Sequence, residues 1–297
     1  MDALRNTQLN DSKGGLSKAI GRSVVGAVGA AAMIYLVICA LQERAPAENA
    51  MTGSFATRMG EHRCEKLPDE SQVCLNTNTK IRYAINRHTR TVELVSGEAS
   101  FTVKSKDPRS FDVLSGGLLV HDLSTSFDVY RKIQTTLVTV IDGQVTVVAP
   151  LSPASLSEFR HVEPVSAWKA APKFHRLQQV EFDETTGTLS ARNSLTEDGL
   201  AQLLAWQRGR IDLNGRTLRD ALTEFARYQP VDRFNIPERS LRDFRVGGEL
   251  DATSLKDFLD TLEFLHHIHH SVATTADGKV SITLSRQRIG VPHSNSK

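Results

Sequence analysis

Two cysteines, Cys64 and Cys74, stand where a disulfide can form. They flank Leu67-Pro68-Asp69-Glu70-Ser71, a run whose proline, aspartate and serine are typical of a turn between two strands. A hairpin centred on position 69 sets the two sulfur atoms opposite each other, where cross-strand Cβ atoms are close enough for a bridge. The hairpin therefore predicts a Cys64–Cys74 disulfide. Two free thiols are the alternative, and a metal site is disfavoured because no companion ligand lies nearby.

Four histidines, His266, His267, His269 and His270, invite a metal hypothesis. They follow a predicted helix, and histidines near a helix C-terminus are favoured by the helix dipole. In a strand, alternate residues point to opposite faces, so each face would carry two imidazoles without a third ligand. We therefore predict no metal site and no cofactor, and we keep a periplasmic metal sensor as an alternative function.

The sequence contains no recognisable catalytic motif. It has no nucleophile elbow, P-loop or G-x-G-x-x-G run, and no histidine or aspartate lies in a catalytic context. The net charge is +2 and no basic block is interleaved with aromatic residues, which disfavours nucleic acid as a partner. We expect a protein that is not an enzyme and has no catalytic residues.

An uncharged run of 19 residues, Ser23–Leu41, predicts a transmembrane helix over residues 23–42. At 1.5 Å per residue it covers the roughly 30 Å of a bilayer core. Basic residues precede the run and acidic ones dominate after it, so residues 1–22 are expected in the cytoplasm and the later domains in the periplasm of a bacterial inner-membrane protein. The alternatives are a signal peptide cleaved at Ala45-Pro46-Ala47 and a lipoprotein joined through Cys39. An oxidising periplasm would favour the disulfide.

Residues 57–149 alternate apolar and polar positions in short strands, which predicts an antiparallel all-β sandwich or barrel. Turn signals separate the strands at Ser96-Gly97 and Gly116-Gly117, and Asp142-Gly143 predicts a hairpin. Residues 43–56 read as a polar spacer. Residues 150–205 read as a connector, with an added strand over 174–182 and a short helix over 195–206.

Residues 206–285 contain an internal repeat, in which the helix pattern starting at Thr217 recurs at Ser254. Both residues stand three positions before an aspartate, a variant of the capping box, and each following segment has apolar residues at helical spacing. Strand-like runs flank the helices, at 210–213, 233–236, 243–247 and 268–274, and a last one at 280–284. The repeat predicts a small α+β domain of two β-α-β units, followed by a tail over 286–297.

These motifs resemble the FecR family of iron-transport regulators over about residues 58 to 285. The family's turn L-P-D-G-S corresponds to residues 67–71, with Glu70 in place of the glycine; Ser110 and Ser124 replace a proline and a glycine. The other matching positions are Arg90, Val92, Leu94, Gly97, Glu98, Ala99, Phe101, Val103, Phe111, Val113, Thr125, Phe127, Val129, Val138, Val140, Gly143, Val145, Val147, Trp206, Gly209, Ile211, Arg227 and Tyr228. Their expected roles are structural.

The resemblance implies a single-pass inner-membrane signal transducer. Such proteins regulate an extracytoplasmic-function sigma factor and sense the signalling domain of a TonB-dependent outer-membrane receptor. Residues 206–285 also resemble the short domain shared by secretins and such receptors, so we expect about 206–297 to bind the receptor. Residues 1–22 are too few to bury the core of the family's sigma-binding domain, so any effect on a sigma factor is expected to be indirect. An envelope docking protein using the secretin-like domain is the further alternative.

Overall fold

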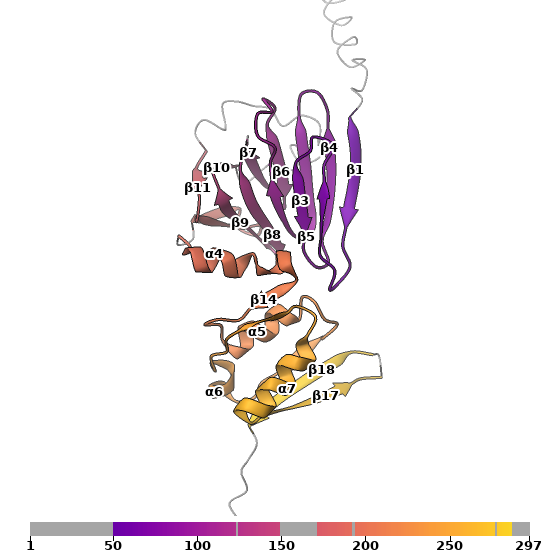
Figure 1. Ribbon diagram of the computed structural model, residues 1–297, viewed down its shortest axis with the longest axis vertical. Helices are drawn as coiled ribbons and strands as arrows, with labels where there is room; N and C mark the ends of the chain where they lie inside the picture. The colour runs from indigo at the N-terminus through magenta and orange to yellow at the C-terminus, as the bar shows by residue number, and fades with distance from the viewer. Residues whose placement is uncertain (1–49, 123, 149–170, 192–193, 277, 287–297) are drawn as a thin grey trace, which may run out of the picture. The chain divides into compact units, whose positions relative to one another are not determined.

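The computed structural model describes residues 50–122, 124–148, 171–191, 194–276 and 278–286 (Figure 1). The predicted tail 1–22, the predicted transmembrane helix 23–42, the third cysteine Cys39 and most of the tail 286–297 lie outside these residues. Among the residues described, no helix is both long enough and apolar enough to span a bilayer.

Residues 51–191 form two β-sheets that share one long strand, β5. One sheet has the order β1-β4-β5-β6-β7-β10-β11, and the other has the order β2-β3-β5-β8-β9-β12-β13. The prediction of an all-β, sandwich-like fold is confirmed for this region. The strands are β1 (Met51–Ala56), β2 (Arg63–Lys66), β3 (Gln72–Leu75), β4 (Lys80–Ile85), β5 (Arg90–Thr102), β6 (Phe111–Ser115), β7 (Leu118–Asp122), β8 (Ser126–Lys132), β9 (Thr135–Asp142), β10 (Gln144–Val148), β11 (Lys173–His175), β12 (Gln179–Asp183) and β13 (Thr188–Ala191).

Strand β5 passes from one sheet to the other at Gly97. Residues before the glycine pair with β4 and β6, and residues from the glycine onward pair with β3 and β8. Gly97 has φ +87°, and a Cβ atom there would lie 2.6 Å from the Cα of Thr79, so only glycine fits. The turn predicted at Ser96-Gly97 is therefore a bend within one strand.

The hairpin predicted at Asp142-Gly143 is wrong. Strand β9 pairs with β8 and β12, whereas β10 pairs with β7 and β11 in the other sheet. Gly143 is the single residue between the two strands, too few for a two-residue hairpin loop, and its φ of +82° carries the chain across to the other sheet. The Gly116-Gly117 turn does join a hairpin, β6 to β7.

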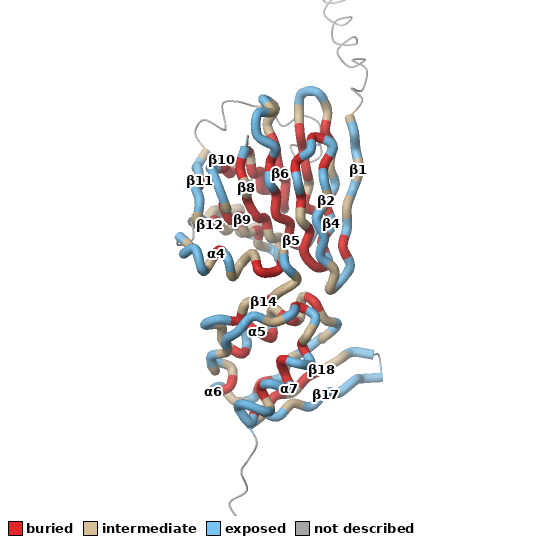
Figure 2. The backbone as a smooth tube through the Cα atoms, in the orientation of Figure 1, coloured by how far each residue is buried: buried red, intermediate tan, exposed pale blue. Residues whose placement is uncertain are grey.

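The core of this β region is built from the alternating apolar positions of the strands, and Figure 2 shows it as the buried centre of β5, β6 and β8. Phe101 lies between Phe111 and Phe127, with ring centroids 5.9 and 5.3 Å away. All three rings are fully buried. Phe101, Phe111 and Phe127, each two residues before a valine, thus have the structural role expected of them.

A buried ion pair and its hydrogen bonds join two loops of the same region to β5. Arg90, at the start of β5, donates from Nη1 to Asp69 Oδ2 at 3.2 Å, and both side chains are fully buried. Asp69 also accepts from the hydroxyl of Ser71 at 2.7 Å, and Arg90 Nε donates to the carbonyl of Ser110. Because a buried charge needs a partner and further hydrogen bonds, this pair fixes the turn between β2 and β3.

The regions predicted as spacer and connector contain more regular structure than expected. Strand β1 lies in the predicted spacer 43–56 and pairs with β4 along its whole length. The strand predicted over 174–182 is two strands, β11 and β12, and β13 follows them. The predicted helix 195–206 consists of α4 (Glu197–Leu203) and the 3-10 helix η1 (Ala205–Arg208). Strands β1 and β13 were not predicted, because both are short and have few buried residues.

Residues 210–286 form a second hydrophobic cluster around two helices, α5 (Leu218–Phe225) and α7 (Leu255–His266). The predicted apolar faces are buried, and Thr217 accepts from the backbone N–H of Asp220 as the capping pattern predicts. Ser254 makes no side-chain capping bond, so the pattern holds only for the first helix. The remaining elements are β14 (Arg210–Asp212), β15 (Arg233–Asn235), α6 (Arg239–Arg242), β16 (Glu249–Asp251), β17 (Ile268–Thr274) and β18 (Val280–Arg286).

The strands of this unit form two small sheets, β14-β16 and β15-β18-β17. The first strands of the two repeats therefore pair with each other, while β15 runs parallel to β18. The strand predicted over 243–247 lies instead at Glu249–Asp251, and α6 was not predicted. The two last predicted strands are present as β17 and β18, which pair antiparallel with Thr274 opposite Val280.

Glu70 provides a test of the turn that Arg90 and Asp69 fix. Glu70 has φ +68°, the left-handed region in which a side chain costs about 1–2 kcal/mol and glycine costs none. Its carboxylate pairs with the exposed Lys104, a contact of small value. We expect Glu70→Gly to raise the free energy of unfolding by about 0.5–1 kcal/mol, measured by urea denaturation. Glu70→Ala keeps the strained backbone and should bring no gain; equal gains in both variants would contradict this explanation.

Candidate functional site

Glu98 and Arg227, which lie 129 residues apart in the sequence, form a buried ion pair between the β region and the second cluster. Glu98 follows the bend at Gly97 on β5, and Arg227 lies one residue beyond the C-cap of α5. The Glu98 side chain is 4% exposed and that of Arg227 is 17% exposed. A second carboxylate, that of Glu224 in the last turn of α5, accepts from Arg227 Nη1 at 2.7 Å.

Three neutral side chains surround this ion pair: Asn76, Tyr130 and Tyr228. Together with Glu98 and Arg227 they form what we call the Glu98–Arg227 network. Asn76 donates from Nδ2 to Glu98 Oε2 at 2.7 Å and accepts from the hydroxyl of Tyr228 at 3.0 Å. The guanidinium of Arg227 lies over the ring of Tyr130, 4.2 Å from its centroid. Such a cation–π contact is strengthened when the cation is removed from water.

Local structure explains why these groups meet. Asn76 follows β3, and its backbone N–H donates to the carbonyl of Glu98 at 2.9 Å, so the β-sheet register sets the two side chains together. The next residue, Thr77, donates from its hydroxyl to the backbone carbonyl of Arg227 at 3.1 Å. The end of α5 thus contacts polar groups that the β-sheet register has already brought together.

Burial shapes the electrostatics of the network. Burial opposes the charge of Arg227, but the carboxylates of Glu98 and Glu224 raise its pKa well above the usual value. Burial raises the pKa of Tyr130 to about 12 and also raises the pKa of Tyr228. Arg227 is therefore a fixed cation, and the two tyrosines are neutral groups.

Asp128 on β8 lies beside this network and is 2% exposed. Burial raises the pKa of Asp128 well above the ordinary value, and the negative charge of Glu98 raises it further. Its Oδ1 atom has no hydrogen-bond partner among the residues that the structure describes. The arrangement favours one protonated carboxyl group beside one carboxylate, as for two acids that share a site.

Two hollows flank Arg227. One has a volume of about 610 Å³ and is lined by Thr77, Gly97 and Ile133 among others. The other has a volume of about 280 Å³ and is lined by Asp128, Gln202 and further polar side chains. Tyr130, Lys132 and Arg227 line both. Hollows of this size can hold water, and neither contains a paired nucleophile and base.

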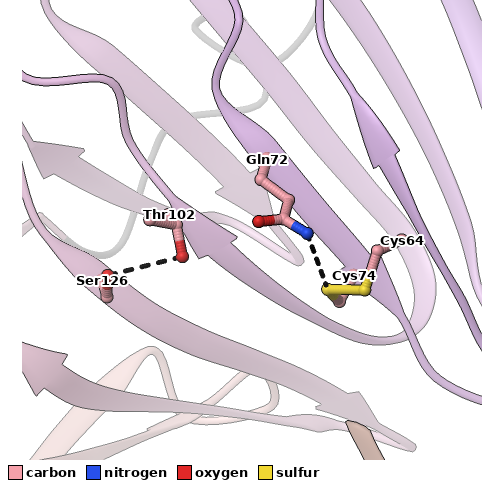
Figure 3. Close-up of a disulfide and its surroundings, with 5 residues drawn as sticks. All are labelled: Cys64, Gln72, Cys74, Thr102 and Ser126. Atoms are coloured by element: carbon pink, nitrogen blue, oxygen red, sulfur yellow. Dashed lines mark hydrogen bonds between the residues drawn. A yellow bond between two sulfur atoms is a disulfide. The ribbon is translucent and has the colours of Figure 1, made fainter.

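The structure joins Cys64 and Cys74 in a disulfide between β2 and β3 (Figure 3). The two residues are directly opposite in the sheet register, as the hairpin centred on position 69 predicted, and their Cα atoms are 3.9 Å apart. Gln72 donates to the Sγ atom of Cys74 at 3.9 Å, and Ser126 and Thr102 pair nearby on β8 and β5. Cys74 also packs against the second hydrophobic cluster.

The four histidines are divided between two elements. His266 ends α7 with its ring against Phe244, and His267 follows in the left-handed region with φ +53°. His269 and His270 lie on β17, where the Nδ1 atoms of both are 2.9 and 3.0 Å from the carboxylate of Glu263. Among the described residues, no group of three or more His, Cys, Asp or Glu side chains could hold a metal ion.

Sequence reasoning missed the network although it named Glu98, Arg227 and Tyr228 as motif residues. One signal was available: Glu98 is a charged residue between the apolar positions of a strand and next to a glycine. Its partner could not be found this way, because nothing in the spacing of 129 residues indicates a contact.

Asp128→Asn tests the protonation of Asp128. A raised pKa in the folded state means that folding takes up a proton, so wild-type stability falls as pH rises above about 4, until the pH reaches the folded pKa. The amide mimics the neutral carboxyl group. We therefore expect the stability of Asp128→Asn relative to wild type to increase with pH by at most about 1.4 kcal/mol per unit, measured by thermal unfolding from pH 4 to 8.

Asp128→Ala separates ionisation from packing in that experiment. Asp128→Ala removes the same titrating group but leaves a cavity. Its stability should therefore be lower than that of Asp128→Asn by an amount that does not depend on pH. Relative to wild type, the stability of both variants should increase with pH. A pH-independent difference between Asp128→Asn and wild type would contradict the raised pKa.

The disulfide is expected to stabilise the protein by about 2–3 kcal/mol, because it closes a short loop. A Cys64→Ala/Cys74→Ala variant should lose this amount in urea denaturation. Reductant should lower wild-type stability equally and leave the double variant unchanged. Mass spectrometry without reductant should find no alkylatable thiol at either position; two alkylated cysteines in the native protein would overturn the pairing.

Comparison with known proteins gives three findings. Residues 54–146 match the family described as "FecR protein". A candidate anti-sigma factor from Parabacteroides distasonis ATCC 8503 has a similar fold in two crystal structures, at 22% identity in each. The TM-scores are 0.56 and 0.55, and the matches cover 79% and 80% of this chain and 99% and 100% of the other. None of the curated proteins matches. The resemblance to the FecR family noted in the sequence is thus confirmed by the match over residues 54–146.

Proposed function

We propose that this protein is a FecR-type regulator of an extracytoplasmic-function sigma factor, which senses an envelope partner through its C-terminal region. The FecR match over residues 54–146 carries this proposal. The likeness of the fold to that of a candidate anti-sigma factor supports it, since that likeness extends over 79% of the chain and so includes residues beyond the matched segment. The polar, acid–base-paired site described above suits a role in coupling protein parts better than a role in catalysis.

The proposal places the protein in the bacterial inner membrane. The uncharged run Ser23–Leu41, with basic residues before it, supports a single transmembrane helix and a cytoplasmic N-terminus. Residues 50–286 then lie in the periplasm, where an oxidising environment is compatible with the Cys64–Cys74 disulfide.

The surface proposed for the partner is the β17 edge of residues 210–286. Strand β17 is a terminal strand of its sheet and pairs only with β18 among the described residues. Figure 2 shows β17 as mostly exposed, and its Val272 is 58% exposed. At the end of α7, which leads into β17, Phe264 and Leu265 are 81% and 59% exposed.

An open strand edge beside exposed apolar side chains is suited to strand addition. The backbone N–H and C=O groups of an edge strand can pair with a partner strand, and apolar side chains beside it add affinity. Under this proposal the partner is the signalling domain of a TonB-dependent receptor, a small domain that can present such a strand. Contacts of this kind are modest in area and reversible.

The test measures binding of the cognate receptor's signalling domain to residues 50–297 by calorimetry. Val272→Pro removes a backbone donor and disturbs the β17 edge, so we expect binding at least tenfold weaker, the loss of about 1.4 kcal/mol. Ile133→Ser is the matched control, because Ile133 is a 92% exposed apolar residue on the β region. It should leave the affinity unchanged.

Two outcomes would contradict the proposal. Absence of binding by the wild-type fragment would remove the receptor as partner. Weaker binding by Ile133→Ser, with Val272→Pro unaffected, would place the partner on the β region instead. Circular dichroism of both variants should confirm that each is folded as wild type.

A further inference from the structure

The contacts described above between the β region and the second hydrophobic cluster are mostly polar. The two clusters share no residue, and Cys74 is the β-region side chain that packs against the second cluster. The other contacts described above are hydrogen bonds and charges, centred on Glu98 and Arg227. Polar contacts between parts of one chain make relative motion the default expectation.

The energetics of a buried ion pair suit a contact that opens. Removing two charges from water is costly, and their attraction repays that cost only with good geometry and additional hydrogen bonds. When the contact opens, both Glu98 and Arg227 regain water, whereas an apolar contact would lose about 25 cal/mol for each Å² exposed. The two hollows that Arg227 lines provide room for water to reach the contact.

A packed path joins this contact to the proposed partner surface. Arg227 lies two residues after the end of α5 at Phe225. The ring of Phe225 stacks on that of Phe258 in α7, with ring centroids 5.1 Å apart. Helix α7 ends at His266 and β17 begins two residues later at Ile268. A partner strand on β17 can therefore alter the position of α5, and with it that of Arg227.

From these observations we propose that the Glu98–Arg227 network is a releasable lock: the β region and the C-terminal unit separate when it opens, and partner binding at the β17 edge favours the open state. This inference rests on the proposed function for the identity of the partner. The lock itself does not depend on it, because opening can be measured in the protein alone.

Glu98→Gln is the decisive variant. The amide keeps the shape of Glu98 and can still bind Asn76, but it removes the charge opposite Arg227. We expect a larger radius of gyration by X-ray scattering and at least fivefold faster amide exchange at Arg227 and Tyr228, while amides inside the two cores stay protected. Glu197→Gln is the control, since Glu197 forms an exposed ion pair with Arg176 outside the network; it should behave as wild type.

The coupling is tested with the receptor's signalling domain. If the partner favours the open state, Glu98→Gln should bind it at least fivefold more tightly, near the lower end of measured couplings between sites. Equal affinity of wild type and Glu98→Gln would overturn the coupling. Unchanged scattering and exchange, or loss of protection throughout both cores, would overturn the lock. Failure of wild type to bind counts against the proposed function, because the scattering and exchange results do not involve the partner.

Discussion

The close approach of β5 to Thr79 is the constraint on which the rest of the structure depends. No side chain can be accommodated at position 97, and this lets one strand serve two sheets. The same bend determines where Glu98 lies, at the end of the β region that receives the last turn of α5. A backbone requirement at one glycine therefore sets both the layering of the β region and the position of the charge that binds the C-terminal unit.

The chain uses two buried arginines for different purposes. Arg90 lies within one region, and Asp69 and backbone carbonyls surround it, so nothing can separate it from its partners without unfolding the sheet. Arg227 joins two separate cores, with hollows on either side. The physics of the two ion pairs is the same, but only the second lies where a rigid-body movement can break it.

The sequence allowed prediction of features that depend on local chemistry. The Cys64–Cys74 register, the amphipathic helices α5 and α7 and the Phe-x-Val core positions all follow from spacing within a few residues. Where the chain changes sheets, local reasoning failed: Asp142-Gly143 has the composition of a hairpin, yet a single glycine with positive φ serves equally to leave a sheet. The short edge strand β1 gave no signal, since its stabilisation comes from pairing with β4 rather than from its own sequence.

The candidate site was less predictable than the fold. Glu98 and Arg227 are individually ordinary residues, and only the tertiary structure brings them within hydrogen-bonding distance. Rules based on neighbouring residues cannot predict this contact, because it depends on how the two hydrophobic cores are oriented. Asp128 was missed for a similar reason, since its environment arises from Glu98 on the neighbouring strand rather than from its own sequence.

The order of the residues along the chain has a consequence for folding. Cys64 and Cys74 are close in sequence, so their bridge can close as soon as the β2–β3 hairpin forms, at small cost in loop entropy. Asn76 and Thr77 follow directly, and they precede the whole C-terminal unit during synthesis. The β region can thus be complete before residues 206–286 exist, and it then acts as a template on which the last turn of α5 is positioned.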